Sequence, residues 1–273
     1  MDKIKIKVYA KINLVLDIVG VREDGYHELE MLNSSVSIYD TISACKSDKS
    51  VVFMNGVKAS KNNTALKTLQ ILKESFNIDM RVNIQKRIPF SAGLGGSSAD
   101  ASGVFFCAHK LFGIPLDRLA SLAVKVGCDV PYMISGGGAR VRGVGEIVEP
   151  CEVPQLALVI CQSEYGASTK DIYKTYDKIG AYSRSGNHFN ALEKSAVSLN
   201  PNIQLAKEQL KRFTDEVFMT GSGSAYVGVF NSLEEAKRCL DSLVGDFVFK
   251  GVAQTLENGI EIIEQIPPLL VVY

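Results

Sequence analysis

The segment Pro89–Asp100, with the sequence PFSAGLGGSSAD, constrains the fold of this chain more than any other feature. Apolar and polar residues alternate over 80–88 before it, which predicts a half-buried strand. After it, apolar residues recur at helical spacing over 97–112, and Gly113 supplies a stop signal. The sequence therefore predicts a strand, a glycine-rich turn and a helix in direct succession.

The composition of this turn suits phosphate binding. Glycines let the backbone approach a ligand, and the free N–H groups at a helix start point at an anion that the helix dipole favours. Ser97 and Ser98 add hydroxyl donors. The turn is neither a Walker A loop, since no Gly-Lys-Ser/Thr follows, nor a dinucleotide fingerprint, since the third glycine is missing. Considered alone, such a glycine-rich loop could instead be a tight turn that serves only close packing and binds no phosphate.

Two segments near the start of the chain carry polar side chains that could meet a ligand. Strand alternation would place Lys11 and Asn13 on one face, where both can contact a phosphate or hydroxyl. Asp24-Gly25 predicts a turn directly before Tyr26 and His27, which could stack on a planar base and read its polar edge. A solvated lysine and an ordinary hairpin turn are the alternative.

A further candidate is Asp129, which lies among apolar residues beside a predicted helix end. A carboxylate in that position can act as a catalytic base or cap the following turn. The glycine-serine segment Gly221–Ser224 stands between two predicted strands. It could close over a ligand or only reverse the chain.

The charge balance argues against a nucleic-acid-binding protein. The 273 residues contain 30 Lys plus Arg and 30 Asp plus Glu, whereas such proteins generally carry a basic surplus. With 46% hydrophobic and 22% charged residues and no apolar run of membrane-spanning length, a folded globular protein is expected. Six cysteines without a CxxC pair fit small buried residues in a reducing compartment. We therefore predict a cytoplasmic protein without nucleic-acid or membrane partners.

Strands and helices alternate irregularly along the chain, which is typical of the α+β class. Further strands are predicted at 3–8, 12–19, 36–42, 51–54, 141–148, 156–161, 226–230 and 247–253, and further helices at 64–76, 116–126, 168–179, after Pro201 and at 233–244. Pro150 and Pro154 favour a linker between two domains, which we place at residues 1–153 and 154–273.

Taken in order, these segments resemble the GHMP kinase superfamily, whose ATP loop has the form Pro-x-x-x-Gly-Leu-Gly-x-Ser-Ser. Pro89 to Ser98 match this form, although Ser97 stands where a third consecutive glycine is usual. Within the superfamily, five segments are similar to the 4-diphosphocytidyl-2-C-methyl-D-erythritol kinase family: 10–14, 24–27, 127–131, 143–146 and 220–223. The resemblance extends from Ala10 to about Phe230.

This resemblance implies a two-domain α+β fold, with an N-terminal domain like domain 2 of ribosomal protein S5 and a ferredoxin-like C-terminal domain. It implies transfer of the ATP γ-phosphate to the 2-hydroxyl of 4-diphosphocytidyl-2-C-methyl-D-erythritol, an intermediate of the non-mevalonate route to isoprenoid precursors. ATP and Mg²⁺ are the expected cofactors, without a predicted metal ligand. The expected assembly is a monomer or a homodimer.

The resemblance also implies roles for single residues. Asp129 would accept the proton of the substrate hydroxyl, and Lys11 would orient that hydroxyl. Tyr26 and Tyr173 would enclose the cytosine with His27 at its edge, and Asn13 and Thr169 would line the same pocket. Asn63 and Lys86 would lie near the adenine, and the phosphates would be held by Pro89, Phe90, Ser91, Ala92, Gly93, Leu94, Gly95, Gly96, Ser97, Ser98 and Ala99.

Two other functions are compatible with parts of the sequence. Another kinase of the superfamily could act on homoserine, mevalonate or a sugar, but Tyr26 and His27 suit a pyrimidine better than such small substrates. A non-catalytic RNA-binding module could use Lys3, Lys5 and Lys7 on one strand face. The neutral total charge opposes that second reading.

Overall fold

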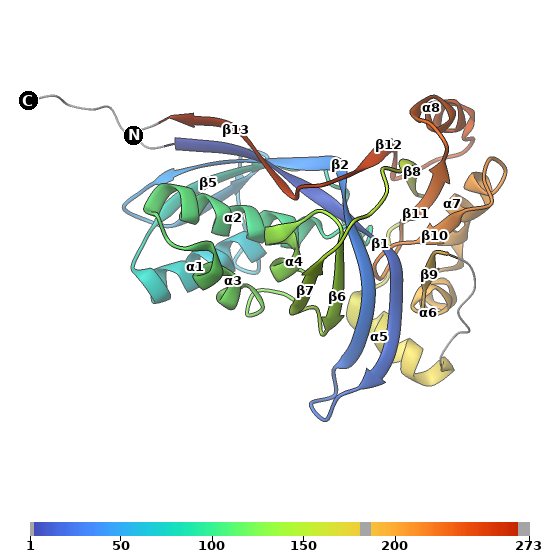
Figure 1. The fold of residues 1–273 in the computed structure, drawn as a ribbon, viewed down its shortest axis with the longest axis horizontal. Coiled ribbons are helices and arrows are strands. Elements are labelled where there is room, and N and C mark those ends of the chain that lie inside the picture. The colour runs from blue at the N-terminus through green and yellow to red at the C-terminus, as the bar shows by residue number, and fades with distance from the viewer. Residues whose placement is uncertain (1–2, 181–186, 267–273) are drawn as a thin grey trace, which may run out of the picture.

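The computed structural model of the protein describes residues 3–180 and 187–266, which form a mixed α+β fold (Figure 1). Its strands are β1 (Lys3–Val21), β2 (His27–Lys46), β3 (Val51–Met54), β4 (Val57–Lys58), β5 (Met80–Gln85), β6 (Ala139–Gly143), β7 (Ile147–Pro150), β8 (Ala157–Gln162), β9 (Phe189–Asn190), β10 (Val217–Met219), β11 (Tyr226–Phe230), β12 (Phe249–Leu256) and β13 (Ile260–Ile266). Its helices are α1 (Thr64–Phe76), α2 (Gly96–Phe112), α3 (Leu116–Ala123), α4 (Val130–Ser135), α5 (Thr169–Ile179), α6 (Glu193–Leu199), the 3₁₀ turn Pro201–Ile203, α7 (Gln204–Leu210) and α8 (Leu233–Ser242).

The described strands belong to one 13-stranded sheet, whose main path runs β10-β11-β8-β12-β2-β5-β3-β4. Strand β12 pairs with β8 on one side and with β2 on the other, so it joins the two halves of the molecule. Helices α1 to α4 lie together beside β1, β2 and β5, whereas α6 to α8 lie in the other half (Figure 1). None of the helices within 3–180 and 187–266 is long and apolar enough to cross a membrane.

The antiparallel hairpin of β1 and β2 is the longest pairing of the sheet, running from Lys3 opposite Cys45 to Val21 opposite His27. The predicted strands at 3–8 and 12–19 are therefore one continuous strand. Its register shifts between Tyr9 and Ala10 and again after Asn13. These bulges interrupt the alternation of side chains, which is why the sequence pattern suggests two strands.

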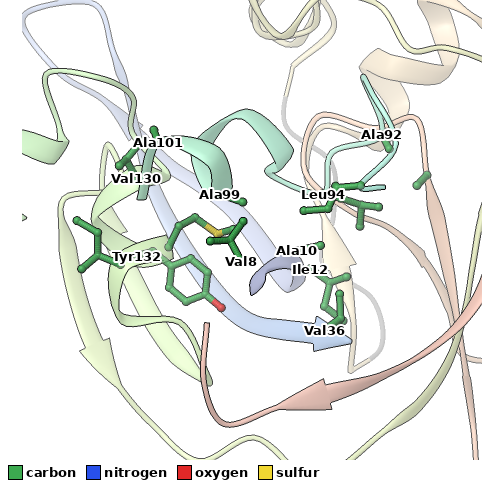
Figure 2. Packing of buried hydrophobic residues seen from close by; sticks show 14 of the residues in the cluster. Val8, Ala10, Ile12, Val36, Ala92, Leu94, Ala99, Ala101, Val130 and Tyr132 are labelled. Carbon is green, nitrogen blue, oxygen red and sulfur yellow. The ribbon is translucent and has the colours of Figure 1, made fainter. Parts of the chain in front are cut away.

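The glycine-rich turn is positioned by the packing of α2 on this hairpin. Figure 2 shows the small residue Ala99 of α2 close to Val8 of β1, and Ala101 of α2 beside Val130 of α4. At Gly103 a Cβ atom would lie 2.5 Å from Ile42 and 2.6 Å from Val8. The backbone of α2 therefore packs directly on these two side chains of the hairpin. This close contact fixes the start of α2, and with it the turn, above the centre of β1.

The predictions for β3, β11 and α2 are confirmed to within a residue, whereas the single strand predicted at 141–148 is wrong. Strands β6 and β7 form an antiparallel hairpin there, with Arg142 opposite Ile147. Gly143 and Gly145 adopt φ angles of 72° and 118° in the turn, which interrupts the apolar run. Helices α4 and α6 were not predicted, because each is too short for a periodic pattern.

The end of the described chain returns to its beginning. Strand β13 pairs antiparallel with β1, from Lys3 opposite Ile266 to Val8 opposite Ile260. Tyr9 and Lys7 both hydrogen-bond Glu261, which fastens β13 to the hairpin. The proposed boundary between residues 153 and 154 stays a prediction, and strands beyond it complete the sheet of the first half.

Candidate active site

A cleft of about 1230 Å³ lies where the glycine-rich turn, the β1–β2 hairpin, the start of α5 and the turn 221–223 meet. It brings together most of the predicted site residues: Lys11, Tyr26, His27, Asn63, Lys86, the segment 89–98, Asp129, Thr169 and Tyr173. Asn13 and Ala99 are fully buried and do not line it. Residues far apart in the sequence thus line one cleft.

The start of α2 is open to an anion. Gly95 precedes the helix with φ 70°, no side chain caps it, and its first turn carries no acidic residue. The first N–H groups of the helix are therefore available to a ligand. Gly93, with φ 77°, has no room for a Cβ atom because the carbonyl oxygen of Thr220 lies against it.

The glycine-rich turn is held by the second half of the chain. The backbone N–H groups of Ser224 and Ala225 donate to the carbonyls of Ser91 and Ala92, each at 3.1 Å. The amide of Gln162 donates to the carbonyl of Ser91 at 3.2 Å and to that of Phe90 at 3.0 Å. The predicted phosphate loop is thus positioned from both halves of the molecule.

A buried charged cluster of Asp40, Lys86 and Asp100 contacts the end of the same turn at Gly96. The ammonium of Lys86 contacts the carboxylates of Asp40 and Asp100, and it also donates to the carbonyl of Gly96 at 3.3 Å. Asp40 accepts the backbone N–H groups of Arg87 and Ile88. Burial, together with the charge of Asp40, raises the pKa of Asp100 to about 7 despite the opposing charge of Lys86. Burial alone would lower the pKa of Lys86, but the two carboxylates outweigh it and raise that pKa.

Lys11 and Asp129 lie next to each other at the wall of the cleft. The Nζ atom of Lys11 donates to Oδ1 of Asn13 at 2.6 Å and lies 3.9 Å from Oδ2 of Asp129. Burial lowers the pKa of Lys11, and the charge of Asp129 opposes that shift. Asp129 precedes α4 but makes no capping hydrogen bond, so its half-buried carboxylate is free to act in the cleft.

Asn13 connects Lys11 to the turn at 220–223. Its Oδ1 also accepts the N–H of Gly221 at 2.9 Å, and its own backbone N–H donates to Oγ1 of Thr220 at 3.0 Å. Asn190 holds the same turn by donating to the carbonyls of Met219 and Gly221, both at 2.8 Å. The sequence analysis missed Asn190, since a single asparagine in a two-residue strand gives no signal.

The other end of the cleft is lined by aromatic side chains. Tyr26 is 60% exposed and follows the turn in which Oδ1 of Asp24 accepts its N–H. The ring of Tyr173 lies 4.8 Å from that of His27 with an angle of 33° between the planes. His27 and Asp177 are 2.7 Å apart, a contact that the sequence analysis did not predict. Oγ1 of Thr169 is hydrogen-bonded to Oγ of Ser222 at 2.9 Å.

The protein ligands for a metal ion are few. Within the described part of the chain, no three side chains of His, Cys, Asp or Glu gather as a metal-binding group. The cleft offers Asp129 and the hydroxyl of Ser98 beside the loop. This set fits Mg²⁺, which keeps several waters and is held largely by phosphate oxygens in kinases.

Comparison with known proteins identifies the family. The model of the GHMP kinase N-terminal domain matches residues 63–138, and that of the GHMP kinase C-terminal domain matches residues 170–248. A 4-diphosphocytidyl-2-C-methyl-D-erythritol kinase of a Thermoanaerobacter species is 33% identical over 97% of this chain and 100% of its own length. The enzyme of the same name from Clostridium beijerinckii is 35% identical over 88% of this chain and 95% of its own length.

A solved structure supports the same assignment. The crystal structure of a 4-(cytidine 5'-diphospho)-2C-methyl-D-erythritol kinase superposes with a TM-score of 0.79 at 28% identity, covering 92% of this chain and 98% of the other. The expectation of a two-domain GHMP kinase fold of the α+β class is therefore confirmed. The chain belongs to the 4-diphosphocytidyl-2-C-methyl-D-erythritol kinase family of the GHMP kinases.

Proposed function

We propose that this protein uses ATP to phosphorylate the 2-hydroxyl of 4-diphosphocytidyl-2-C-methyl-D-erythritol, giving the 2-phosphate and ADP in the non-mevalonate pathway. The observation that carries the proposal is the single cleft in which Lys11 and Asp129 lie between a glycine-rich anion site and an aromatic pocket. A phosphate donor can occupy the glycine-rich end while an acceptor that carries a nucleobase occupies the aromatic end. Phosphoryl transfer depends mainly on such positioning and on charge stabilisation.

In this proposal the 2-hydroxyl binds between Lys11 and Asp129. Asp129 accepts its proton as the oxygen attacks the γ-phosphorus, and the bond from that phosphorus to the ADP oxygen breaks. The ammonium of Lys11, oriented by Asn13, stabilises the negative charge that develops nearby. Because Lys11 is buried, water screens its charge less than it would at the protein surface.

The ATP phosphates would be held by the N–H groups of the segment 89–99 and the start of α2. Asn63 and Lys86 would lie on the adenine side of this segment. Bound Mg²⁺ would neutralise charge on the phosphates, with the hydroxyl of Ser98 as its ligand from this chain. The charged cluster that contacts Gly96 would hold the backbone of the loop in place when ATP binds.

The acceptor would occupy the aromatic end of the cleft. Tyr26, exposed in the free protein, would stack on the cytosine, with Tyr173 on the far side and His27 at the edge of the base. Thr169 would contact the diphosphate from the start of α5, while Asn13 acts through Lys11. We further propose that the protein works in the cytoplasm as a monomer or homodimer, without nucleic-acid or membrane partners.

A direct assay tests the proposal. The protein is incubated with Mg-ATP and 4-diphosphocytidyl-2-C-methyl-D-erythritol, and the products are separated by mass. We expect a product heavier by one phosphate group, and none when the acceptor is mevalonate or homoserine. Phosphorylation of mevalonate or homoserine alone would refute the proposed substrate and leave the family assignment intact.

A further inference from the structure

The imidazole of His27 is held by three side chains from one face of α5. Tyr176 and Asp177 follow Tyr173 by three and four residues, so all three side chains lie on one side of the helix. The rings of Tyr173 and Tyr176 lie 4.8 and 5.9 Å from the His27 ring, the second nearly perpendicular to it. Oδ1 of Asp177 lies 2.7 Å from Nε2 of His27. In Figure 1, α5 lies beside the end of the β1–β2 hairpin that carries His27.

This contact determines which nitrogen of His27 carries hydrogen. An ionised carboxylate only accepts hydrogen bonds, and a neutral imidazole has one N–H. The hydrogen of neutral His27 must therefore reside on Nε2, facing Asp177. The other nitrogen, Nδ1, is then left as an acceptor. Because His27 and Asp177 are both among the residues that line the cleft, this contact lies at its wall.

We propose that Asp177 is a specificity-determining residue, which makes His27 present an acceptor to the base of the substrate. The 4-amino group of cytosine is a donor, whereas the corresponding oxygen of uracil is an acceptor, as it is in thymine. An acceptor on His27 therefore favours a cytidine diphosphate derivative over its uridine counterpart. This inference rests on the proposed function, because it requires the base to bind beside His27.

The Asp177→Asn variant provides the decisive test. Its amide has nearly the same shape but can either accept from or donate to Nε2, so it no longer restricts the hydrogen of His27 to that nitrogen. We expect wild-type protein at about pH 8 to bind CMP about tenfold to a hundredfold more tightly than UMP. Asp177→Asn and Asp177→Ala should each reduce that ratio to within a few fold, because neither side chain restricts the hydrogen of His27 to Nε2. Titration calorimetry measures both affinities.

The control is Asp171→Asn, which removes the same charge from the same helix without contact to His27. This variant should keep the wild-type ratio. A readout independent of ligand is heteronuclear NMR of the imidazole nitrogens, assigned with a His27→Gln variant. Wild-type protein should show hydrogen on Nε2 of His27, and Asp177→Asn should show it shared between Nε2 and Nδ1.

The inference is overturned if wild-type His27 carries its hydrogen on Nδ1, or if neither Asp177 variant changes the ratio of CMP to UMP affinity. Failure of the proposed function gives a different result, since wild-type protein would then not phosphorylate the cytidylyl substrate. A protein that phosphorylates this substrate, but whose base preference is unaffected by Asp177, would refute the role of Asp177 alone.

Discussion

The Nζ atom of Lys11 and the Oδ2 atom of Asp129 are 3.9 Å apart, farther than a hydrogen bond and close enough for one oxygen atom to contact both. The ammonium of Lys11 also donates to Oδ1 of Asn13 at 2.6 Å, which orients it at this distance from Asp129. The pair is therefore prepared to receive a hydroxyl group.

Replacing Asp129 by Asn should remove the proton acceptor and keep the shape of the cleft. We expect kcat to fall by about 10² to 10⁴ with little change in the KM for ATP, measured by steady-state kinetics. Glu149→Gln, which alters an exposed carboxylate paired with Arg142, is the control and should keep wild-type turnover. Turnover near wild type in Asp129→Asn would exclude Asp129 as the base.

Gly93 tests the contact between the glycine-rich turn and Thr220. Gly93→Ala should be destabilising both because its φ is 77° and because the Cβ atom would overlap the Thr220 carbonyl. Gly113→Ala is the matched control, with φ 69° and no atom within 4 Å of the added Cβ, so it should cost only about 1 kcal/mol. We expect a clearly larger loss in the free energy of unfolding for Gly93→Ala, together with weaker ATP binding. Equal losses in the free energy of unfolding for the two variants, measured by urea denaturation, would show that the glycine-rich turn does not pack tightly against Thr220.

The cluster of Asp40, Lys86 and Asp100 should make stability depend on pH. The pKa of Asp100 is raised from 3.8 to about 7, so between these values the folded state retains a proton that the unfolded state has released. The free energy of unfolding should therefore fall as the pH rises through this window. Asp100→Asn should weaken this dependence, whereas Asp241→Asn on the exposed side of α8 should not. Denaturation curves at several pH values measure the slope, and an unchanged slope in Asp100→Asn would contradict the assignment.

Tyr26 should affect ligand binding and leave stability unchanged. It is 60% exposed, and Tyr165, outside the cleft, is 59% exposed and serves as a matched control. Tyr26→Ala should weaken CMP binding by about 1–3 kcal/mol through loss of stacking, while Tyr165→Ala leaves it as in wild type. Neither change should shift the melting temperature appreciably. Wild-type affinity of Tyr26→Ala for CMP would rule out stacking on this ring.

The parts that could be predicted from sequence are those determined by neighbouring residues. Asn63 caps α1 by accepting the N–H of Leu66, directly before the helix predicted at 64–76. The strand, turn and helix around Gly93 follow in the same way from local periodicity and glycine content.

The supporting residues could not be predicted, because their partners are distant in the chain. Asp40, Asp100 and Asp177 look like ordinary solvated carboxylates in the sequence, since nothing local indicates burial or a partner. The spacing of Tyr173 and Asp177 does indicate a common helix face, but it does not indicate that His27 lies opposite. Only the packing of α5 against the hairpin brings these groups together.

The backbone hydrogen bonds that join Ser91 and Ala92 to Ser224 and Ala225 have a consequence for synthesis of the chain. The ribosome releases the glycine-rich turn long before the segment that holds it, and strand β1 meets β13 later still. Nucleotide binding should therefore appear late in translation, and a nascent chain ending before residue 220 should leave this turn accessible to proteases and chaperones.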